Sequence, residues 1–215
     1  MKRFAALALI TLTLSSPSAQ SGTPISAEDI LKVATASVLD LSDDGRRVAV
    51  GVRRLFDNAE TNHRRYGDPT YVTPSLIEVR VVDTATGAGD RVGPGLMNVR
   101  SAAFTPDAAR LALLTASETP AGLPVTTLWV YEISGKRLTQ VPRFAGAEVA
   151  ANSDLAWAPD GSKLFVALRD PADDRAAQAS FKTLVAGPVV VQTSAPFLDW
   201  DAMNRANRRD RKSVV

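Results

Sequence analysis

The 215-residue sequence contains no cysteine and a single histidine, His63. Without cysteine there can be no disulfides, no thiolate metal ligands and no lipid anchor of the lipoprotein type. His63 has no second histidine or cysteine to share a metal with. We therefore expect His63 to be a surface residue of the polar segment 55–74, and we predict no metal and no cofactor.

Several motifs of catalysis are also missing. The sequence has no G-x-S-x-G serine-hydrolase elbow, no Walker loop, no G-x-G-x-x-G and no H-E-x-x-H. Neighbouring acids do occur, at Asp43 and Asp44 and again at Asp173 and Asp174. Such pairs are typical of solvated turns, whereas catalytic carboxylates must face each other across a cleft. We predict no catalytic residue in this chain.

The apolar run at the N-terminus, residues 4–14, is too short to span a bilayer. It follows Lys2 and Arg3 and precedes small residues from Ser15 to Ser21. These are the three parts of a secretory signal peptide. We expect residues 1–19 to be a cleaved leader, and the mature protein to be periplasmic or extracellular without a membrane partner.

The opposite end, Asp210–Val215, matches the translation of a widely used short-read sequencing adapter up to its stop codon. We interpret residues 210–215 as such a translation; an ordinary basic tail is the alternative. The formal net charge of +2 becomes −1 once Lys2 and Arg3, and the three charged residues of 210–212, are set aside. The basic pI of about 9.1 therefore belongs to the ends, and it predicts no nucleic-acid partner.

What the sequence does contain is a hairpin pattern that occurs three times, in residues 38–52, 101–114 and 155–168. Proline presets φ at the first corner of such a turn, aspartate bonds the backbone ahead of it, and glycine tolerates a positive φ. The turn residues are Asp44 and Gly45; Asp107 and Ala108; and Pro159, Asp160 and Gly161. If residue 108 is left-handed, Ala108→Gly should stabilise the fold by a few tenths to ~1 kcal/mol.

The similarity of the three hairpins extends beyond the turns. An apolar residue stands three positions before each turn aspartate, and a basic residue stands three positions after it. The apolar residues are Leu41, Phe104 and Trp157, and the basic residues are Arg47, Arg110 and Lys163. The aspartates are 63 and then 53 residues apart. This spacing exceeds the ~40–50 residues of a propeller blade, so each repeat must carry insertions.

Two further strands follow each of the first two hairpins. The strand at 77–81 alternates strictly and the strand at 128–133 carries one charge; each leads through a glycine turn to a short closing strand. Apolar character thus falls from the inner strands to the outer ones, as expected of a β-propeller blade. Polar insertions are expected at 55–74 and 117–127.

We therefore predict an all-β fold, a partial β-propeller of about two and a half to three four-stranded antiparallel blades after the signal peptide. The blades, called units one, two and three below, are expected at 36–93, 98–142 and 150–209. Unit three departs from the pattern after its hairpin. There we expect a polar turn at 170–175, a strand at 188–192 and a short helix at 196–205, with no third blade strand.

The repeated hairpin resembles the propeller repeats of TolB-like proteins. It also resembles the N-terminal propeller of exported prolyl oligopeptidase-family serine peptidases, including the dipeptidyl and acylaminoacyl peptidase branches. The leader, the segment 25–32 and the segment 196–205 are more similar to the peptidase branch. The resemblance covers residues 25–209, in which Ala108 stands where the turn prefers glycine.

This resemblance implies a non-catalytic propeller that gates peptide substrates to a C-terminal α/β-hydrolase domain, which would hold the nucleophile, the acid and the histidine. Those positions do not occur in this sequence, so no catalytic residue is transferred. In the full-length parent, the partners would be a peptide substrate and the hydrolase domain. The alternative is a periplasmic TolB-like propeller that binds a protein and has no enzymatic activity. A propeller lactonase is a third reading, and the sequence shows no metal-ligand cluster for it.

Overall fold

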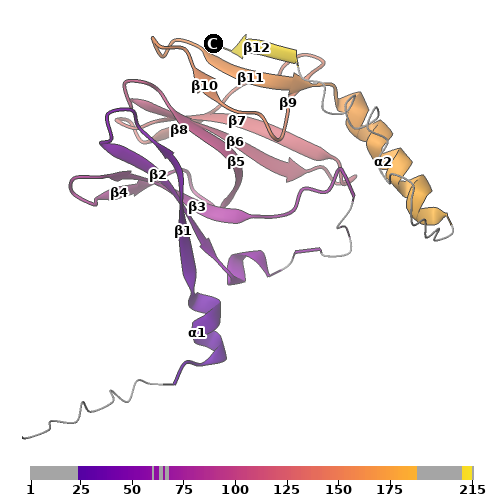
Figure 1. The fold of residues 1–215 in the computed structure, drawn as a ribbon, viewed down its shortest axis with the longest axis horizontal. Helices are drawn as coiled ribbons and strands as arrows, with labels where there is room; N and C mark the ends of the chain where they lie inside the picture. Colours follow the sequence, from indigo (N-terminus) through magenta and orange to yellow (C-terminus); the bar gives the residue numbers. More distant parts are fainter. Residues whose placement is uncertain (1–23, 60, 63–64, 66–67, 188–209, 215) are drawn as a thin grey trace, which may run out of the picture.

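The structure is a computed structural model that describes residues 24–59, 61–62, 65, 68–187 and 210–214. It is mostly antiparallel sheet, with a short helix near its start and a longer one near its end. Figure 1 shows the strands in three groups that follow one another in chain order. Within the described residues, no helix is long and apolar enough to cross a membrane.

Units one and two are four-stranded antiparallel meanders, in which each strand pairs with the next. The strands of unit one are β1 (Ala34–Leu41), β2 (Arg47–Arg54), β3 (Leu76–Asp83) and β4 (Gly89–Arg91). Those of unit two are β5 (Met97–Phe104), β6 (Arg110–Glu118), β7 (Pro124–Glu132) and β8 (Arg137–Gln140). The predicted insertion at 117–127 is shorter than expected, because β6 and β7 extend into it and leave only residues 119–123 between them.

Unit three is built around β11 (Leu164–Arg169). The short strands β9 (Glu148–Val149) and β10 (Ala156–Trp157) both pair with β11, and β12 (Asp210–Val214) is also antiparallel to it. The expectation of no third strand in this unit was therefore wrong, since β12 occupies that place. The strand and helix predicted at 188–192 and 196–205 lie outside the described residues.

The two α-helices begin with side-chain caps. Ser26 and Asp29 form a capping box at the start of α1 (Ala27–Lys32). The polar turn predicted at 170–175 was wrong, because these residues start α2 (Pro171–Ala186). Asp170 is the N-cap and accepts a hydrogen bond from Ala172 N at 2.7 Å. Proline and acids favour the first helical turn as well as loops, and this ambiguity explains the error. A 3-10 turn, η1 (Phe56–Asn58), starts the insertion of unit one.

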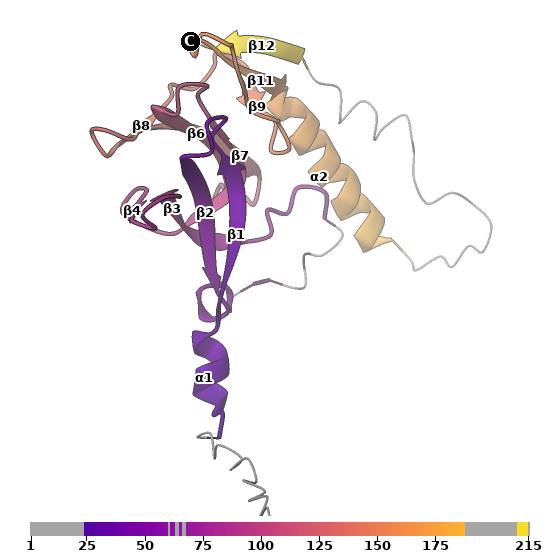
Figure 2. The same cartoon turned by 60° about the vertical axis from the view of Figure 1, so that its left-hand side comes forward.

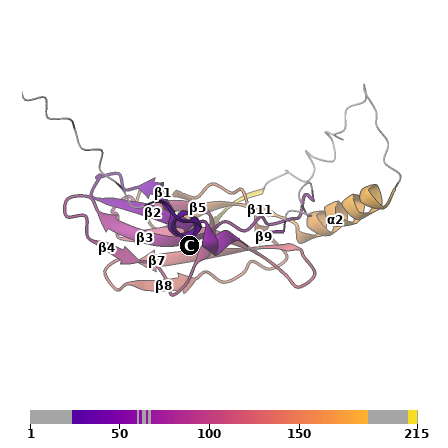
Figure 3. The same cartoon turned by 90° about the horizontal axis from the view of Figure 1, so that it is seen from below.

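The first strands of the three units are neighbours: β5 lies beside β1 on one side and beside β10 on the other. Phe104 N donates to Asp40 Oδ2 at 2.6 Å, and Trp157 Nε1 donates to the Ala103 carbonyl at 3.0 Å. Units one and two are also joined by main-chain pairing, since Leu76 and Ile77 of β3 pair with Asn98 and Met97 of β5, so that β1 to β8 form one eight-stranded sheet. Helix α2 extends away from the sheets and has no buried residue (Figure 2, Figure 3).

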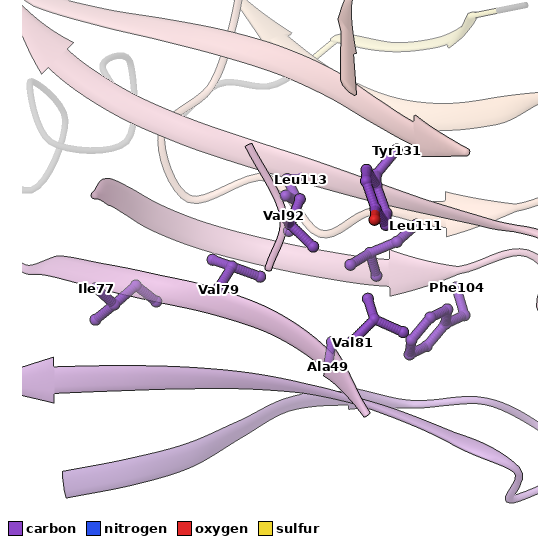
Figure 4. Close-up of a cluster of buried hydrophobic side chains, with 9 residues drawn as sticks. All are labelled: Ala49, Ile77, Val79, Val81, Val92, Phe104, Leu111, Leu113 and Tyr131. Carbon is purple, nitrogen blue, oxygen red and sulfur yellow. The ribbon is translucent and has the colours of Figure 1, made fainter. Parts of the chain in front are cut away.

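Two apolar cores lie between the units. The core between units one and two contains Ala49, Ile77, Val79, Val81, Val92, Phe104, Leu111, Leu113 and Tyr131 (Figure 4). The core between units two and three contains Ala112, Leu114, Leu128, Val149, Leu155, Leu164, Val166 and Leu168. Alternate residues of β6 face opposite cores, so both faces of the strand are covered. Strand β1 was expected to be a buried inner strand, but most of its residues are exposed. The reason is that no unit among the described residues covers its outer face.

Candidate functional site

The third repeat shows the turn geometry most clearly. Gly161 N donates to the Ala158 carbonyl at 2.8 Å, with Pro159 and Asp160 at the corners and φ of +68° at Gly161. Asp160 Oδ1 accepts from Ser162 N at 2.9 Å. This is a type I turn followed by a left-handed residue, a common way to close a β-hairpin.

The other two repeats form the same turn. The N–H of the residue after the aspartate donates to Ser42 O in unit one and to Thr105 O in unit two, at 2.8 Å in both. Gly45 has φ of +69° and Ala108 has φ of +55°, so alanine occupies a left-handed position that favours glycine.

All three turn aspartates have pKa values below the ordinary value of 3.8. The main cause is a hydrogen bond from Arg46 N to Asp44, from the Thr105 hydroxyl to Asp107, and from Ser162 N to Asp160. These hydrogen bonds favour the ionised carboxylate. The three carboxylates therefore stabilise turns, and their environment is not that of a catalytic pair.

The basic residue of each of the first two repeats reaches the turn of the next unit. Arg47 Nη1 donates to the Ala108 carbonyl at 2.5 Å, and Arg110 Nη2 donates to the Gly161 carbonyl at 2.5 Å. The Arg110 guanidinium also lies 4.9 Å from the ring centroid of Trp157. We call these two contacts the arginine bridges. They connect equivalent positions, so they repeat one interface.

The residues that form the arginine bridges are more buried than the equivalent residues that form none. Ala108 and Gly161, whose carbonyls accept a bridge, are buried, and both bridging arginines are half-buried. Gly45, the equivalent turn residue of unit one, is exposed, and so is Lys163, the equivalent basic residue of unit three. A Cβ added at Gly161 would lie 3.7 Å from the Arg110 guanidinium, whereas one at Gly45 would meet nothing within 4 Å. Among the described residues, the turn of unit one accepts no arginine bridge, and the basic residue of unit three donates none.

A recess of about 250 Å³ lies at the other end of the strands. It is shared by the three units and the first turn of α2, and it is lined by Pro69, Thr70, Tyr71, Val72, Arg100, Ala116, Pro124, Ala151, Asn152, Arg169 and Asp174. Its volume is slightly below the ~300–1,000 Å³ of ordinary ligand pockets. It is large enough for a side chain or a very small molecule.

A charged cluster forms one wall of the recess. The Arg169 guanidinium, whose side chain is 11% exposed, contacts Asp174 and lies 3.3 Å from Glu148 Oε2. Burial raises the pKa of Asp174, although the nearby Arg169 opposes this shift. Arg169 Nε has no hydrogen-bond partner among the described residues. The prediction that Asp174 is a solvated turn acid was wrong, because Asp174 contacts Arg169, which lies five positions earlier at the end of β11.

The insertion of unit one is joined to unit two by a second cluster. Both Glu118 oxygens accept from Arg65 Nη1 at 2.8 Å, and Arg65 Nη2 donates to Asp68 Oδ2 at 2.8 Å. The guanidinium also lies 4.8 Å from the ring centroid of Tyr71. These contacts fix residues 68–72, of which Pro69, Thr70, Tyr71 and Val72 line the recess. Nothing in the sequence pattern indicated that Arg65 and Glu118, 53 residues apart, would meet.

His63 lies outside the described residues. Asp43 and Asp173 are exposed. Among the residues that the structure describes, no group of three or more histidines, cysteines or acids could hold a metal ion.

Comparisons with known proteins give a weak signal. No protein-family model matches the chain. Over 127 residues it is 31% identical to the bifunctional protein HldE of Caulobacter sp. (strain K31), a match that covers 55% of this chain and 24% of that protein. The chain thus spans about a quarter of that relative, and the match does not establish a family.

Three solved structures illustrate the structural similarity. Tricorn protease aligns with a TM-score of 0.40 at 12% identity, over 62% of this chain and 11% of the other. The Pyrococcus horikoshii acylaminoacyl peptidase has a TM-score of 0.36 at 21% identity, over 61% and 20%. The β-propeller domain of the Pyrococcus furiosus Trilobed protease has a TM-score of 0.35 at 20% identity, over 61% and 34%. The chain covers only a minor part of each of these structures.

Proposed function

We propose that the chain is a β-propeller scaffold, the N-terminal and non-catalytic part of an exported prolyl oligopeptidase-family serine peptidase. The observation that carries the scaffold is the pair of arginine bridges, Arg47 to Ala108 and Arg110 to Gly161. They join successive units in the same direction and at equivalent positions. Such a repeat builds an array in which each unit contacts only its neighbours.

The peptidase assignment is supported by the sequence resemblance of the hairpin repeat, the leader and the segments 25–32 and 196–205. On this proposal, two and a half to three blades are present, and the nucleophile, acid and histidine belong to an α/β-hydrolase domain in the full-length parent. The propeller would control which peptides reach that domain. The recess end, where the insertions of the units gather, is the end that we assign to contact with peptide or with the hydrolase domain.

The decisive experiment is to read the encoding locus beyond the codon for Arg209 and to express the complete reading frame. We expect a G-x-S-x-G elbow followed by an acid and a histidine. The purified product should cleave aminoacyl- or dipeptidyl-p-nitroanilides and should be labelled by a fluorophosphonate probe, and replacing the elbow serine with alanine should abolish both. A frame that closes after further blades without an elbow would instead favour the TolB-like scaffold.

Export can be tested separately. The reading frame should be expressed in a Gram-negative host, the periplasmic fraction collected, and the N-terminus of the product identified by mass spectrometry. A start within residues 16–22 is expected, because the small residues there offer the cleavage sites. A cytoplasmic product that begins at residue 1 would contradict the proposed localisation.

A further inference from the structure

One arginine of the recess has no acidic partner among the described residues. Arg100 lines the recess, and its Nη2 donates to the Thr73 carbonyl at 3.2 Å. It makes no other hydrogen bond and no ion pair within the part of the chain that the structure describes. A guanidinium carries several N–H donors, so most of those of Arg100 remain available to a ligand.

The backbone of unit two is irregular at Arg100. The pairing of β5 with β6 shifts its register between Val99 and Ser101, which makes Arg100 the extra residue of a β-bulge. Bulges are common next to active sites, where they change the direction of a side chain. In unit one the shift lies at Leu39, closer to the turn, so the repeat by itself does not require a bulge at Arg100.

The setting of Arg100 favours an anionic ligand. The residue is exposed, so a ligand can reach it. Burial nevertheless lowers the pKa of its guanidinium. A bound anion would oppose this effect, because an opposite charge nearby stabilises the charged form. Asn152 also lines the recess and is exposed, and its side-chain amide, which makes no hydrogen bond to another described residue, can donate to the same anion.

The acids near the recess do not compete for Arg100. Asp174 lines the recess, but both Asp174 and Glu148 are paired with Arg169. The acids that hold residues 68–72 are likewise paired with a single arginine; these three residues are Asp68, Glu118 and Arg65. Arg100 is therefore the cation of the recess whose charge no described acid balances.

We propose that the recess binds one carboxylate group of a peptide, which the Arg100 guanidinium holds and the Asn152 amide orients. A guanidinium binds a carboxylate through two parallel hydrogen bonds. A phosphate group, with nearly two negative charges, would be repelled by Asp174 in the same recess. A volume of about 250 Å³ admits a side chain or a chain end, and no more of a peptide. The carboxylate is that of an aspartate or glutamate side chain, or that of the peptide C-terminus.

Titrations with short peptides, followed by NMR at pH 7, test this proposal. One probe is N-acetyl-glycyl-aspartyl-glycinamide, compared with its neutral asparaginyl counterpart. The other is N-acetyl-glycyl-alanyl-glycine with a free C-terminus, compared with its C-terminal amide. We expect the carboxylate form to bind at least about tenfold more tightly than its neutral match, because hydrogen bonds to a charged partner are the stronger ones. The pair that shows this preference identifies the source of the carboxylate.

Variants of the recess test the assignment to Arg100. Arg100→Gln should abolish the preference for the carboxylate form, and Arg100→Lys should retain part of it, because lysine keeps the charge without the planar fork. Asn152→Asp, at an exposed position, should weaken carboxylate binding by like-charge repulsion. Arg53→Gln is the matched control, since Arg53 is an exposed arginine of β2 that does not line the recess, and it should leave the preference unchanged. Circular dichroism checks that each variant is folded.

Three results would overturn the proposal. They are no preference for the carboxylate form in either peptide pair, a preference that survives in Arg100→Gln, and tighter binding of the corresponding phosphoserine peptide than of either carboxylate peptide. The inference rests on the proposed function only in assigning the recess end to peptide contact. Binding is measured without hydrolysis, so a negative result here leaves the expected G-x-S-x-G elbow untouched. A reading frame without that elbow would in turn leave the carboxylate preference untouched.

Discussion

Removing the Arg110 side chain should destabilise the junction between units two and three by about 2–3 kcal/mol. Its hydrogen bond to the Gly161 carbonyl has a charged donor and a half-buried setting, which is worth about 1.5–3 kcal/mol. Its contact with the Trp157 ring adds about 0.5–1 kcal/mol. The two contributions share one side chain and are not fully additive, so Arg110→Ala should lose somewhat less than their sum.

The comparison with Lys163 makes this prediction specific. Lys163 holds the same place in the repeat but is exposed, so Lys163→Ala should change the free energy of unfolding by less than about 0.5 kcal/mol in the monomer. Arg110→Lys retains the charge but loses the planar stacking on the Trp157 ring. We expect this variant to lower the free energy of unfolding by about 1 kcal/mol.

Urea denaturation followed by tryptophan fluorescence, at a concentration low enough to keep the chain monomeric, measures all three variants. With a slope of about 1–3 kcal/mol/M, Arg110→Ala should move the midpoint by about 1 M. If Arg110→Ala and Lys163→Ala shift the midpoint equally, the arginine bridges do not stabilise the array and the argument for a repeated interface fails.

Three further predictions concern other contacts. Ala108→Gly should stabilise the chain by a few tenths to about 1 kcal/mol in thermal or urea melts, because φ is +55° at residue 108; the adjacent Ala109→Gly, which has no positive φ, should destabilise it instead. The lowered pKa values of the turn aspartates mean that their stabilisation is complete above the ordinary pKa of 3.8 and is lost as the pH falls through the lower pKa of the folded state. A pH series of urea melts should therefore show a decline in the free energy of unfolding that Asp160→Asn reduces. Glu118→Gln should weaken the ion pair with Arg65 and increase thermolysin cleavage within residues 68–72 about five- to thirtyfold, and unchanged cleavage would show that the pair does not hold this segment.

Much of the fold could be predicted from the sequence, because its determinants are local. The hairpin turns depend on Pro, Asp and Gly within four residues, and the strands of units one and two follow from short apolar or alternating runs. The helix α2 was missed for the converse reason. Asp170 and Pro171 are equally suited to a turn and to a helix start, and the sequence alone does not choose between them.

The sequence by itself determined the repeated turn, its aspartates and the spacing that makes Arg47, Arg110 and Lys163 equivalent. Only the tertiary structure decided what these residues do, because an arginine's partner in the next unit is 51 to 61 positions away and no local pattern encodes it. The same holds for Asp174, whose pKa is raised by burial, against the opposing effect of Arg169. The repeat determines which positions of the three units are equivalent. The packing of one unit on the next determines which of these positions are buried and which are exposed.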